Sequence, residues 1–146
     1  MSVSVVKIPR GEQEYIDSSW DIKQEINSKQ DLLNQNKRFF HDTYLYGDSY
    51  IALEKDKIVG FGIVIRDSYL ALLGVKPDEQ GRGLGKKIMK EILDDYDELT
   101  CHTRVTNDRA IDFYRGLGFK IDEIERDYYK NNENAAFMKF EEKTAD

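Results

Sequence analysis

The chain has 146 residues, of which 40% are hydrophobic and 34% charged, with only two prolines and a formal net charge of −6. This composition is typical of a globular protein with one sizeable core, so we expect a single domain over residues 1–146. The negative charge argues against a nucleic-acid partner held by phosphate neutralisation. No apolar run is long enough to span a bilayer and the first residues lack a secretion-signal pattern, so we expect no membrane partner.

Cysteine and histidine are scarce, which limits the chemistry. Cys101 is the only cysteine, so no intrachain disulfide can form, and we expect a cytoplasmic location. Two histidines and one cysteine cannot build a usual zinc site without several carboxylates. We therefore expect no metal.

The first part of the chain shows one strand pattern followed by helical patterns. Val3–Ile8 alternates apolar and polar residues, as a short strand does. Asp17–Ser19 supplies candidate N-caps for a helix that starts at Trp20. Polar residues 27–30 favour a break into two helices, the second ending near Phe40. The expected apolar side consists of Trp20, Ile22, Ile26, Leu32 and Leu33.

Three strand patterns follow Gly47. They cover Tyr50–Leu53, Ile58–Arg66 and Tyr69–Val75. The polar segment Glu54–Lys57 lies between the first two and has the length of a hairpin turn.

The remaining chain alternates helices and strands. The patterns predict a helix over Lys86–Tyr96 and a strand over Leu99–Val105. A helix over Asn107–Leu117 is ended by glycines, and strands over Phe119–Glu125 and Ala135–Phe140 complete the pattern. The order β-α-α-β-β-β-α-β-α-β-β predicts an α/β fold, with a mixed, mostly antiparallel sheet flanked by helices.

A glycine-rich segment, Gln80–Lys86, connects the third of these strand patterns to the next helix. Glycines let the backbone approach an anion closely, and a helix start offers free N–H groups, so we expect a phosphate-bearing cofactor here. The dinucleotide pattern G-x-G-x-x-G fails because the third glycine, Gly85, comes one position early. The triphosphate loop G-x-x-x-x-G-K-[S/T] fails because Lys87 stands at its last position and Gln80 at its first.

The segment resembles the acyl-coenzyme-A loop of the GCN5-related N-acetyltransferases, [Q/R]-x-x-G-x-[G/A], with Gln80, Gly83 and Gly85 at its defined positions. Asn107–Phe119 resembles the second signature of that family, an Asn-led helix that carries a tyrosine and ends in Gly-Phe. The resemblance covers roughly Ile58–Phe140 and implies the GCN5-related (GNAT) fold, with acetyl-coenzyme A as cofactor and coenzyme A as product. The alternative is an unrelated α/β domain with a glycine turn.

The same resemblance implies a set of cofactor-binding residues. Backbone N–H groups near Gly74 and Val75 would polarise the thioester carbonyl, and the glycine loop with the following helix start would hold the pyrophosphate. Asn107 resembles a cofactor-contacting residue, and it is also a candidate N-cap of its own helix. The set is Leu73, Gly74, Val75, Gln80, Gly81, Arg82, Gly83, Leu84, Gly85, Lys86, Asn107 and Tyr114.

The catalytic residues implied are Tyr114, His102 and Tyr69. Tyr114 resembles the family's general acid, and core packing is its alternative role. His102 stands five residues before Asn107. At the position of His102, bacterial ribosomal-protein N-terminal acetyltransferases have Glu, and the NatE-type enzyme has a His that is paired with a strand tyrosine. Tyr69 matches that tyrosine, so Tyr69 and His102 would together bind a water. The alternatives are that His102 bonds a backbone carbonyl and that Tyr69 packs at the sheet edge. Cys101 points to the opposite strand face, which argues against a nucleophile–base dyad.

Tyr128 and Tyr129 resemble the Tyr-Tyr hairpin with which N-α-acetyltransferases contact the first residues of a peptide; a solvated aromatic hairpin is the alternative. An α-amino group, with a reference pKa of about 7.7–8.0 against about 10.4 for lysine, is the easier amine to deprotonate. The resemblance thus implies acetyl transfer to the N-terminus of a protein or peptide. The alternatives are a lysine or polyamine-type acetyltransferase and a non-catalytic acyl-coenzyme-A sensor. The family's apolar loop between the first two helices has no counterpart in residues 27–31.

Overall fold

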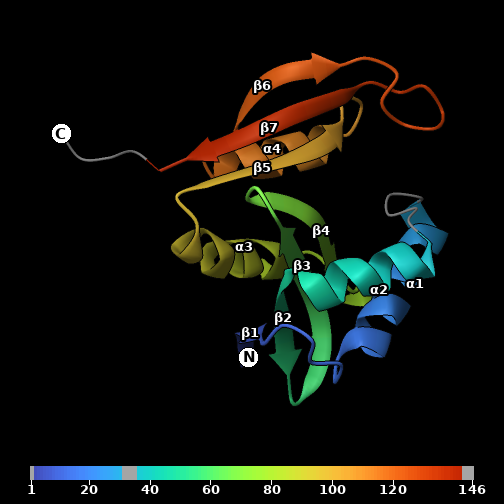
Figure 1. Cartoon of the computed structure of the whole chain (residues 1–146), viewed down its shortest axis with the longest axis vertical. Coiled ribbons are helices and arrows are strands. Elements are labelled where there is room, and N and C mark those ends of the chain that lie inside the picture. The colour runs from blue at the N-terminus through green and yellow to red at the C-terminus, as the bar shows by residue number, and fades with distance from the viewer. Residues whose placement is uncertain (1, 31–35, 143–146) are drawn as a thin grey trace. The chain divides into compact units, whose positions relative to one another are not determined.

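The computed structural model describes residues 2–30 and 36–142, which belong to two compact units, Met1–Asp95 and Tyr96–Asp146 (Figure 1). The order of strands and helices is the expected one, so the predicted α/β fold class is confirmed. The single domain over residues 1–146 stays a prediction. Within residues 2–30 and 36–142, no helix combines the length and apolar content that crossing a membrane requires.

The sheet of the first unit runs in the order β1-β2-β3-β4, with every neighbouring pair antiparallel. These strands are β1 (Val3–Ile8), β2 (Asp48–Glu54), β3 (Lys57–Ile65) and β4 (Tyr69–Val75). The hairpin between β2 and β3 turns at Lys55 and Asp56, whose φ values are 52° and 64°. Positive φ at both central residues is typical of a type I′ turn, whose twist matches that of the strands it joins.

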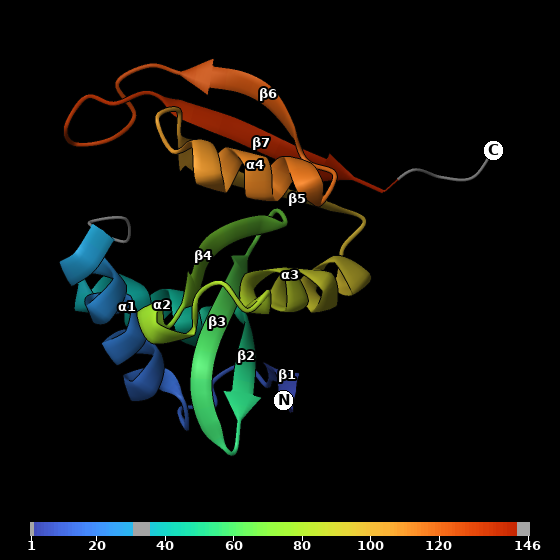
Figure 2. The same cartoon turned by 180° about the vertical axis from the view of Figure 1, so that it is seen from behind.

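Helices cover both faces of this sheet (Figure 2). Helices α1 (Ile16–Gln30) and α2 (Lys37–Tyr46) pack on one face, and α3 (Leu84–Asp95) packs on the other. The core under α1 and α2 is aromatic and aliphatic, with the rings of Phe40 and Phe61 edge to face at 5.9 Å. Its other members include Ile22, Ile26, Tyr44, Ile51, Ile63 and Leu72.

Helix α1 begins earlier than predicted. It starts at Ile16, so Asp17–Ser19 form its first turn, and the prediction that they are N-caps is wrong. The Glu12 carboxylate accepts hydrogen bonds from the backbone of Gln13 and Glu14 instead, at 2.9 and 3.1 Å. Residues 17–19 already lie inside the helix, where the backbone N–H of Ser19 donates to the carbonyl of Tyr15 at 2.9 Å, so they cannot cap its start.

The boundary between the two helices also differs. Helix α1 continues to Gln30, so the predicted break at residues 27–30 is wrong. The Asn36 side chain caps α2 by accepting from the backbone N–H of Phe39 at 2.8 Å, and α2 runs past Phe40 to Tyr46. The predicted apolar residues 32 and 33 lie outside the described residues.

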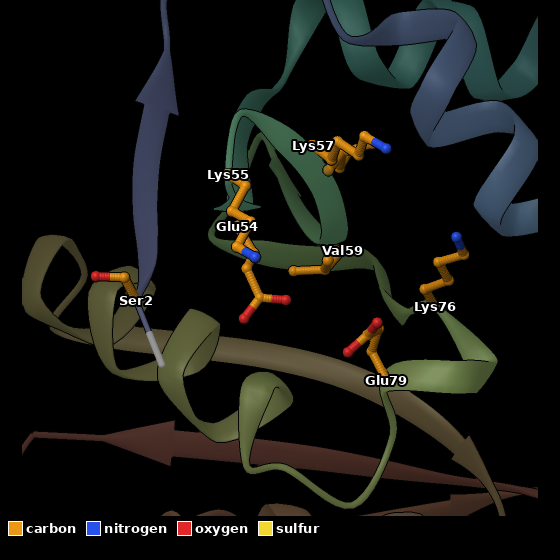
Figure 3. A pocket seen from close by; sticks show the side chains of 8 residues that line it. Ser2, Glu54, Lys55, Lys57, Val59, Lys76 and Glu79 are labelled. Carbon is orange, nitrogen blue, oxygen red and sulfur yellow. The ribbon is translucent and has the colours of Figure 1, made fainter.

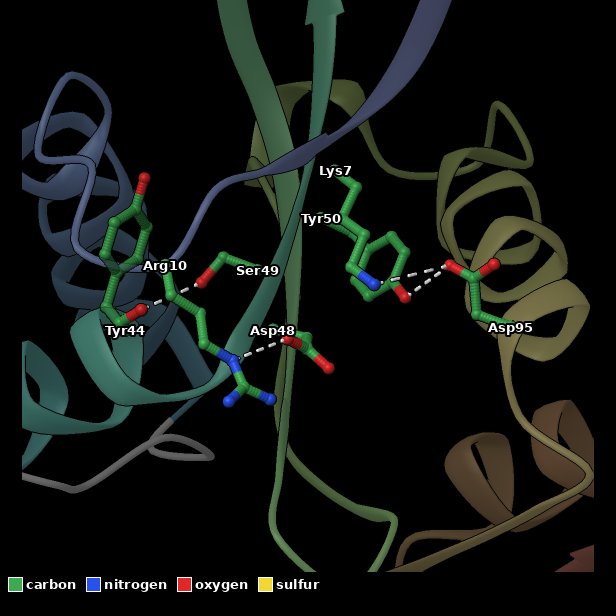
Figure 4. A network of polar contacts seen from close by, with 7 residues as sticks. All are labelled: Lys7, Arg10, Tyr44, Asp48, Ser49, Tyr50 and Asp95. Carbon is green, nitrogen blue, oxygen red and sulfur yellow. Dashed lines mark hydrogen bonds and ion pairs between the residues drawn. The ribbon is translucent and has the colours of Figure 1, made fainter.

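Close packing and polar contacts hold α3 against the sheet. An ideal Cβ on Gly62 would lie 2.9 Å from Cδ1 of Ile92, so this glycine lets the helix approach β3 closely. At the C-terminal end of α3, the Tyr50 hydroxyl donates to the Asp95 carboxylate at 2.7 Å, and Lys7 lies 4.0 Å from the same carboxylate (Figure 4). The helix that follows the predicted cofactor loop is therefore held against the sheet near its C-terminal end.

The sheet of the second unit runs in the order β5-β7-β6, again with antiparallel neighbours. Its strands are β5 (Glu98–Arg104), β6 (Lys120–Glu125) and β7 (Ala135–Glu141), and helix α4 (Asp108–Gly116) joins β5 to β6. A bulge interrupts the pairing of β6 with β7 between Ile121 and Glu123. The face that carries Cys101 and Met138 is buried, with 2% and 0% of their surface exposed.

Candidate functional site

The predicted cofactor loop follows a short 3-10 turn, Pro77–Glu79, and leads into α3. Gly81 and Gly83 have φ values of 87° and 77°, which only glycine adopts without strain. An ideal Cβ at either position meets no described atom within 4 Å, so open space lies beside the loop. The first N–H groups of α3, from Leu84 onward, have no acceptor within the helix. This combination of a glycine loop, open space and a helix start fits a bound pyrophosphate.

Side chains of the loop bind the protein's own groups. The Gln80 amide donates to the backbone carbonyl of Val75 at 3.3 Å and so joins the loop to the end of β4. The Arg82 guanidinium forms ion pairs with Glu54, at 2.6 Å, and with Glu79. The hydrogen bond from Arg82 holds the pKa of Glu54 below its usual value, and the same contacts raise the pKa of Arg82. Arg82 is thus a structural anchor of the loop, and its predicted contact with a cofactor stays a prediction.

A pocket of about 560 Å³ lies beside this anchor (Figure 3). Both carboxylates that bind Arg82, those of Glu54 and Glu79, line it. The remaining lining residues are Ser2, Lys55, Lys57, Ile58, Val59 and Lys76. None of the residues predicted to bind the cofactor is in this lining. The pocket adjoins the loop's anchor without forming the predicted site.

The end of β4 is closely packed around Gly74. An ideal Cβ there would lie 2.9 Å from Cδ1 of Ile26 and 3.0 Å from the ring of Phe61. A side chain at this position would therefore have to displace Ile26 of α1 or Phe61 of β3, whatever the backbone N–H of Gly74 binds. Tyr69, the predicted partner of His102, is at the other end of β4 in the first unit. The pairing of Tyr69 with His102 stays a prediction.

Tyr114 lies on α4 in the second unit and is 9% exposed. Its ring packs edge to face on Phe113 and Phe119, with ring centroids 5.1 and 5.2 Å apart. Tyr114 therefore takes part in core packing. Its hydroxyl hydrogen-bonds the thiol of Cys101, which is itself buried. Burial raises the pKa of the Cys101 thiol to about 12, and the bond from Tyr114 opposes this shift. The thiol is therefore protonated at neutral pH, which argues against a covalent acyl-cysteine route.

Asn107 is the N-cap of α4. Its side-chain oxygen accepts a hydrogen bond from the backbone N–H of Ala110 at 3.1 Å. The capping role is thus confirmed. A contact between Asn107 and the cofactor stays a prediction.

His102 lies on β5 and faces away from Cys101, as predicted from strand alternation. Its Nε2 atom is 2.9 Å from the carboxylate of Glu125 on β6. The ring of Tyr128 stacks on the imidazole, with centroids 4.3 Å apart and planes inclined by 11°, and Phe137 lies at 5.0 Å. A candidate base and a candidate substrate-binding residue are therefore in direct contact.

Arg104 lies two residues further along β5, on the same face as His102. Its guanidinium is 4.2 Å from the ring centroid of Tyr129 and forms an ion pair of 2.6 Å with Glu133. Burial raises the pKa of Tyr129 to about 12. Side chains of one strand thus contact both tyrosines, while Tyr128 remains 46% exposed, so the solvated-hairpin alternative stays open.

Sequence reasoning missed the carboxylates of the site. Three glutamates bind residues that are far from them in sequence: Glu54 binds Arg82, Glu125 binds His102 and Glu133 binds Arg104. No local sequence motif marks these glutamates. Across the described part of the chain, no cluster of His, Cys, Asp and Glu side chains is arranged to bind a metal.

Comparison with known proteins identifies the family. The model of the acetyltransferase (GNAT) family matches residues 13–119. The ribosomal protein bS18-alanine N-acetyltransferase of Salmonella typhimurium is 29% identical over 135 residues, which cover 83% of this chain and 87% of the relative. N-alpha-acetyltransferase 50 of Danio rerio is 33% identical over 73 residues, 46% of this chain and 44% of the relative.

A lysine-directed relative and a solved structure complete the comparison. The peptidyl-lysine N-acetyltransferase YjaB of Escherichia coli is 32% identical over 68 residues, 47% of this chain and 46% of the relative. The crystal structure of the ribosomal-protein-S18-alanine N-acetyltransferase from Escherichia coli superposes with a TM-score of 0.83 at 21% identity, covering 99% of this chain and 97% of that one. GNAT acetyltransferases use acetyl-coenzyme A, which confirms the predicted acyltransferase class and cofactor. This chain belongs to the acetyltransferase (GNAT) family.

Proposed function

We propose that this protein transfers an acetyl group from acetyl-coenzyme A directly to the α-amino group of protein N-termini. One observation carries the proposal: His102 stacks on Tyr128 and the Arg104 guanidinium lies over Tyr129. Both contacting residues lie on the same face of β5. Two phenols held beside a candidate base suit an extended peptide, because their hydroxyls can bond its backbone while their rings line a side-chain pocket. Relatives named as N-terminal acetyltransferases give further support.

The cofactor would be held by this chain's backbone. In the proposal, the N–H groups of Gly81–Lys86 bind the pyrophosphate, and those near Gly74 and Val75 polarise the thioester carbonyl. Asn107, whose side-chain oxygen caps α4, has its amide nitrogen left to contact the cofactor. When bound, the thioester supplies the activated acetyl group.

The chain's own residues would move the protons. The amine nitrogen forms a bond to the carbonyl carbon as the carbon–sulfur bond breaks. His102 accepts the proton lost by the amine, directly or through a water shared with Tyr69, and the Tyr114 hydroxyl protonates the leaving sulfur. The Tyr114 phenolate then regains a proton from solvent and the imidazolium releases one, so the protein gains or loses no net proton in a turnover.

Lysine acetylation is the second candidate function. Relatives from Escherichia coli named as peptidyl-lysine acetyltransferases match 47% and 55% of this chain. The hairpin that holds Tyr128 and Tyr129 is the feature that would select between an N-terminus and a lysine side chain. We also propose a cytoplasmic location, because the single cysteine forms no intrachain disulfide.

A matched substrate panel tests the proposal. The purified protein and acetyl-coenzyme A are incubated with free-N-terminal peptides, the same peptides blocked at the N-terminus but containing lysine, and polyamines. Coenzyme A release gives the rate, and fragment masses locate the acetyl group. We expect acetylation of free N-termini. Reaction with blocked lysine peptides or polyamines alone would contradict the N-terminal assignment.

Variants separate catalysis from binding in the same assay. His102→Ala and Tyr114→Phe should lose turnover while keeping their affinity for coenzyme A, measured by calorimetry. Removing a general acid or base typically costs roughly 10²–10⁴-fold in rate. Full turnover in both variants would remove them from the proposed mechanism.

A further inference from the structure

We infer that Glu125 is a positioning residue for His102, which orients the imidazole so that Nδ1 accepts the proton of the acceptor amine. The inference rests on the proposed role of His102 as base. It adds a residue for which the sequence carries no signature. The contact itself is the 2.9 Å approach of Nε2 to the Glu125 carboxylate.

The register of the sheet explains how the two side chains meet. His102 is paired with Phe137, and Glu125 is paired with Ala135, so the two residues lie diagonally across the central strand β7. Ala135 has a small side chain and is fully buried. Because nothing larger than a methyl group stands at this position, the Glu125 side chain can reach across β7 to the imidazole.

The bulge in β6 decides which residues share the face of His102. Beyond Ile121 the register shifts by one residue, so that Glu123 is paired with Phe137. Since directly paired residues point to the same face, Glu123 and Glu125 lie on the His102 face. Without the bulge, Asp122 and Ile124 would take these places and no glutamate would face the imidazole.

The carboxylate then selects the imidazole tautomer. An ionised carboxylate only accepts hydrogen bonds, so Nε2 must carry the proton that it donates to Glu125. In the neutral ring, Nδ1 is then the basic nitrogen. Only 13% of the His102 side chain and 32% of the Glu125 side chain are exposed, so water competes weakly for this bond.

The same carboxylate supports the charged product of the proton transfer. When Nδ1 takes the amine proton, the ring becomes an imidazolium while Glu125 remains negative, and the two attract each other. Stacking by Tyr128 and the contact with Phe137 hold the ring plane. Proton return from Nδ1 to solvent restores the neutral ring after each turnover.

The test compares Glu125→Gln with Glu123→Gln. Glu123→Gln is the control, because it removes the same charge from the same face of the same strand, at an exposed residue. Imidazole ¹⁵N chemical shifts in the full chain report the tautomer, and His41→Asn assigns the signals because the chain has only two histidines. We expect the Nε2–H tautomer in the native protein and in Glu123→Gln, and a mixture of tautomers in Glu125→Gln.

Kinetics provide the second measurement. In Glu125→Gln we expect kcat to fall by roughly tenfold or more, within the contribution of a general base, with KM for acetyl-coenzyme A unchanged. A native Nδ1–H tautomer, or a Glu125→Gln variant that matches Glu123→Gln in both spectrum and kcat, overturns the inference. Absence of peptide acetylation with a tautomer that still responds to Glu125 overturns the proposed function and supports the orientation by Glu125.

Discussion

Arg82 and Glu54 form an ion pair of 2.6 Å that joins the glycine loop to the end of β2. Glu79, in the turn just before the loop, binds the same guanidinium. The arginine inside the glycine loop is therefore engaged by carboxylates of its own unit. A loop held in this way can present its backbone N–H groups to a pyrophosphate without first becoming ordered.

Loss of this anchor should weaken cofactor binding. In Arg82→Ala, the loop must be ordered when the cofactor binds, so KM for acetyl-coenzyme A should rise while kcat at saturation changes little. Glu54→Gln should reproduce the effect, because it removes the charge that Arg82 binds. Initial-rate kinetics measure both constants. Lys90→Ala, which removes an exposed cation from α3, is the control. Equal KM values in all these variants would show that the anchor has no part in binding.

Cys101 should be unreactive in the folded protein. Its pKa of about 12 lies above the ordinary value of 9.0, so the thiol is protonated over the whole working range and only ionises as the pH rises toward 12. A thiol reagent at pH 8 should modify the native protein slowly and the denatured protein rapidly. Cys101→Ala should keep most of the turnover. A large loss of turnover would require a covalent role for the thiol or a need for its bond to Tyr114.

Gly74→Ala should destabilise the protein. The added methyl group would lie 2.9 Å from Ile26 and 3.0 Å from Phe61, and such overpacking typically costs about 1–3 kcal/mol in the free energy of unfolding. Gly116→Ala is the matched control, since its Cβ meets no described atom within 4 Å and it lies in helix α4. That variant should be more stable by about 0.4–1 kcal/mol. Denaturant unfolding of both variants checks the opposite signs.

Arg104 should matter for the peptide and not for the cofactor. Arg104→Ala removes the cation over Tyr129 and the partner of Glu133, so KM for the peptide should rise with KM for acetyl-coenzyme A unchanged. Arg104→Lys keeps the charge but lacks the planar guanidinium, and should restore the peptide KM only in part. Peptide titrations at saturating acetyl-coenzyme A measure the change. An unaltered peptide KM in Arg104→Ala would contradict a substrate role for this hairpin.

Features that depend on residues close together in the sequence were predicted correctly. Strand β4 has the predicted bounds, Tyr69–Val75, because its apolar run is bounded by turn residues on both sides. The N-cap Asn107 was recognised because a cap bonds its own first turn. The start of α1 was predicted too late because Asp17–Ser19 have side chains typical of N-caps, although they lie inside the helix.

The sequence alone determined the acetyltransferase family, the glycine loop and the order of elements. The family signatures and the loop depend on residue spacing within short segments, and the elements depend on the period of the hydrophobic pattern. Tertiary structure decided which carboxylates support the site. Glu125 lies 23 residues from His102, and Glu54 lies 28 residues from Arg82. Their contacts depend on strand register and, for Glu125, on one bulge that turns alternate side chains to the other face. A shift of one residue in pairing would leave the same sequence motifs in place and remove this contact to His102.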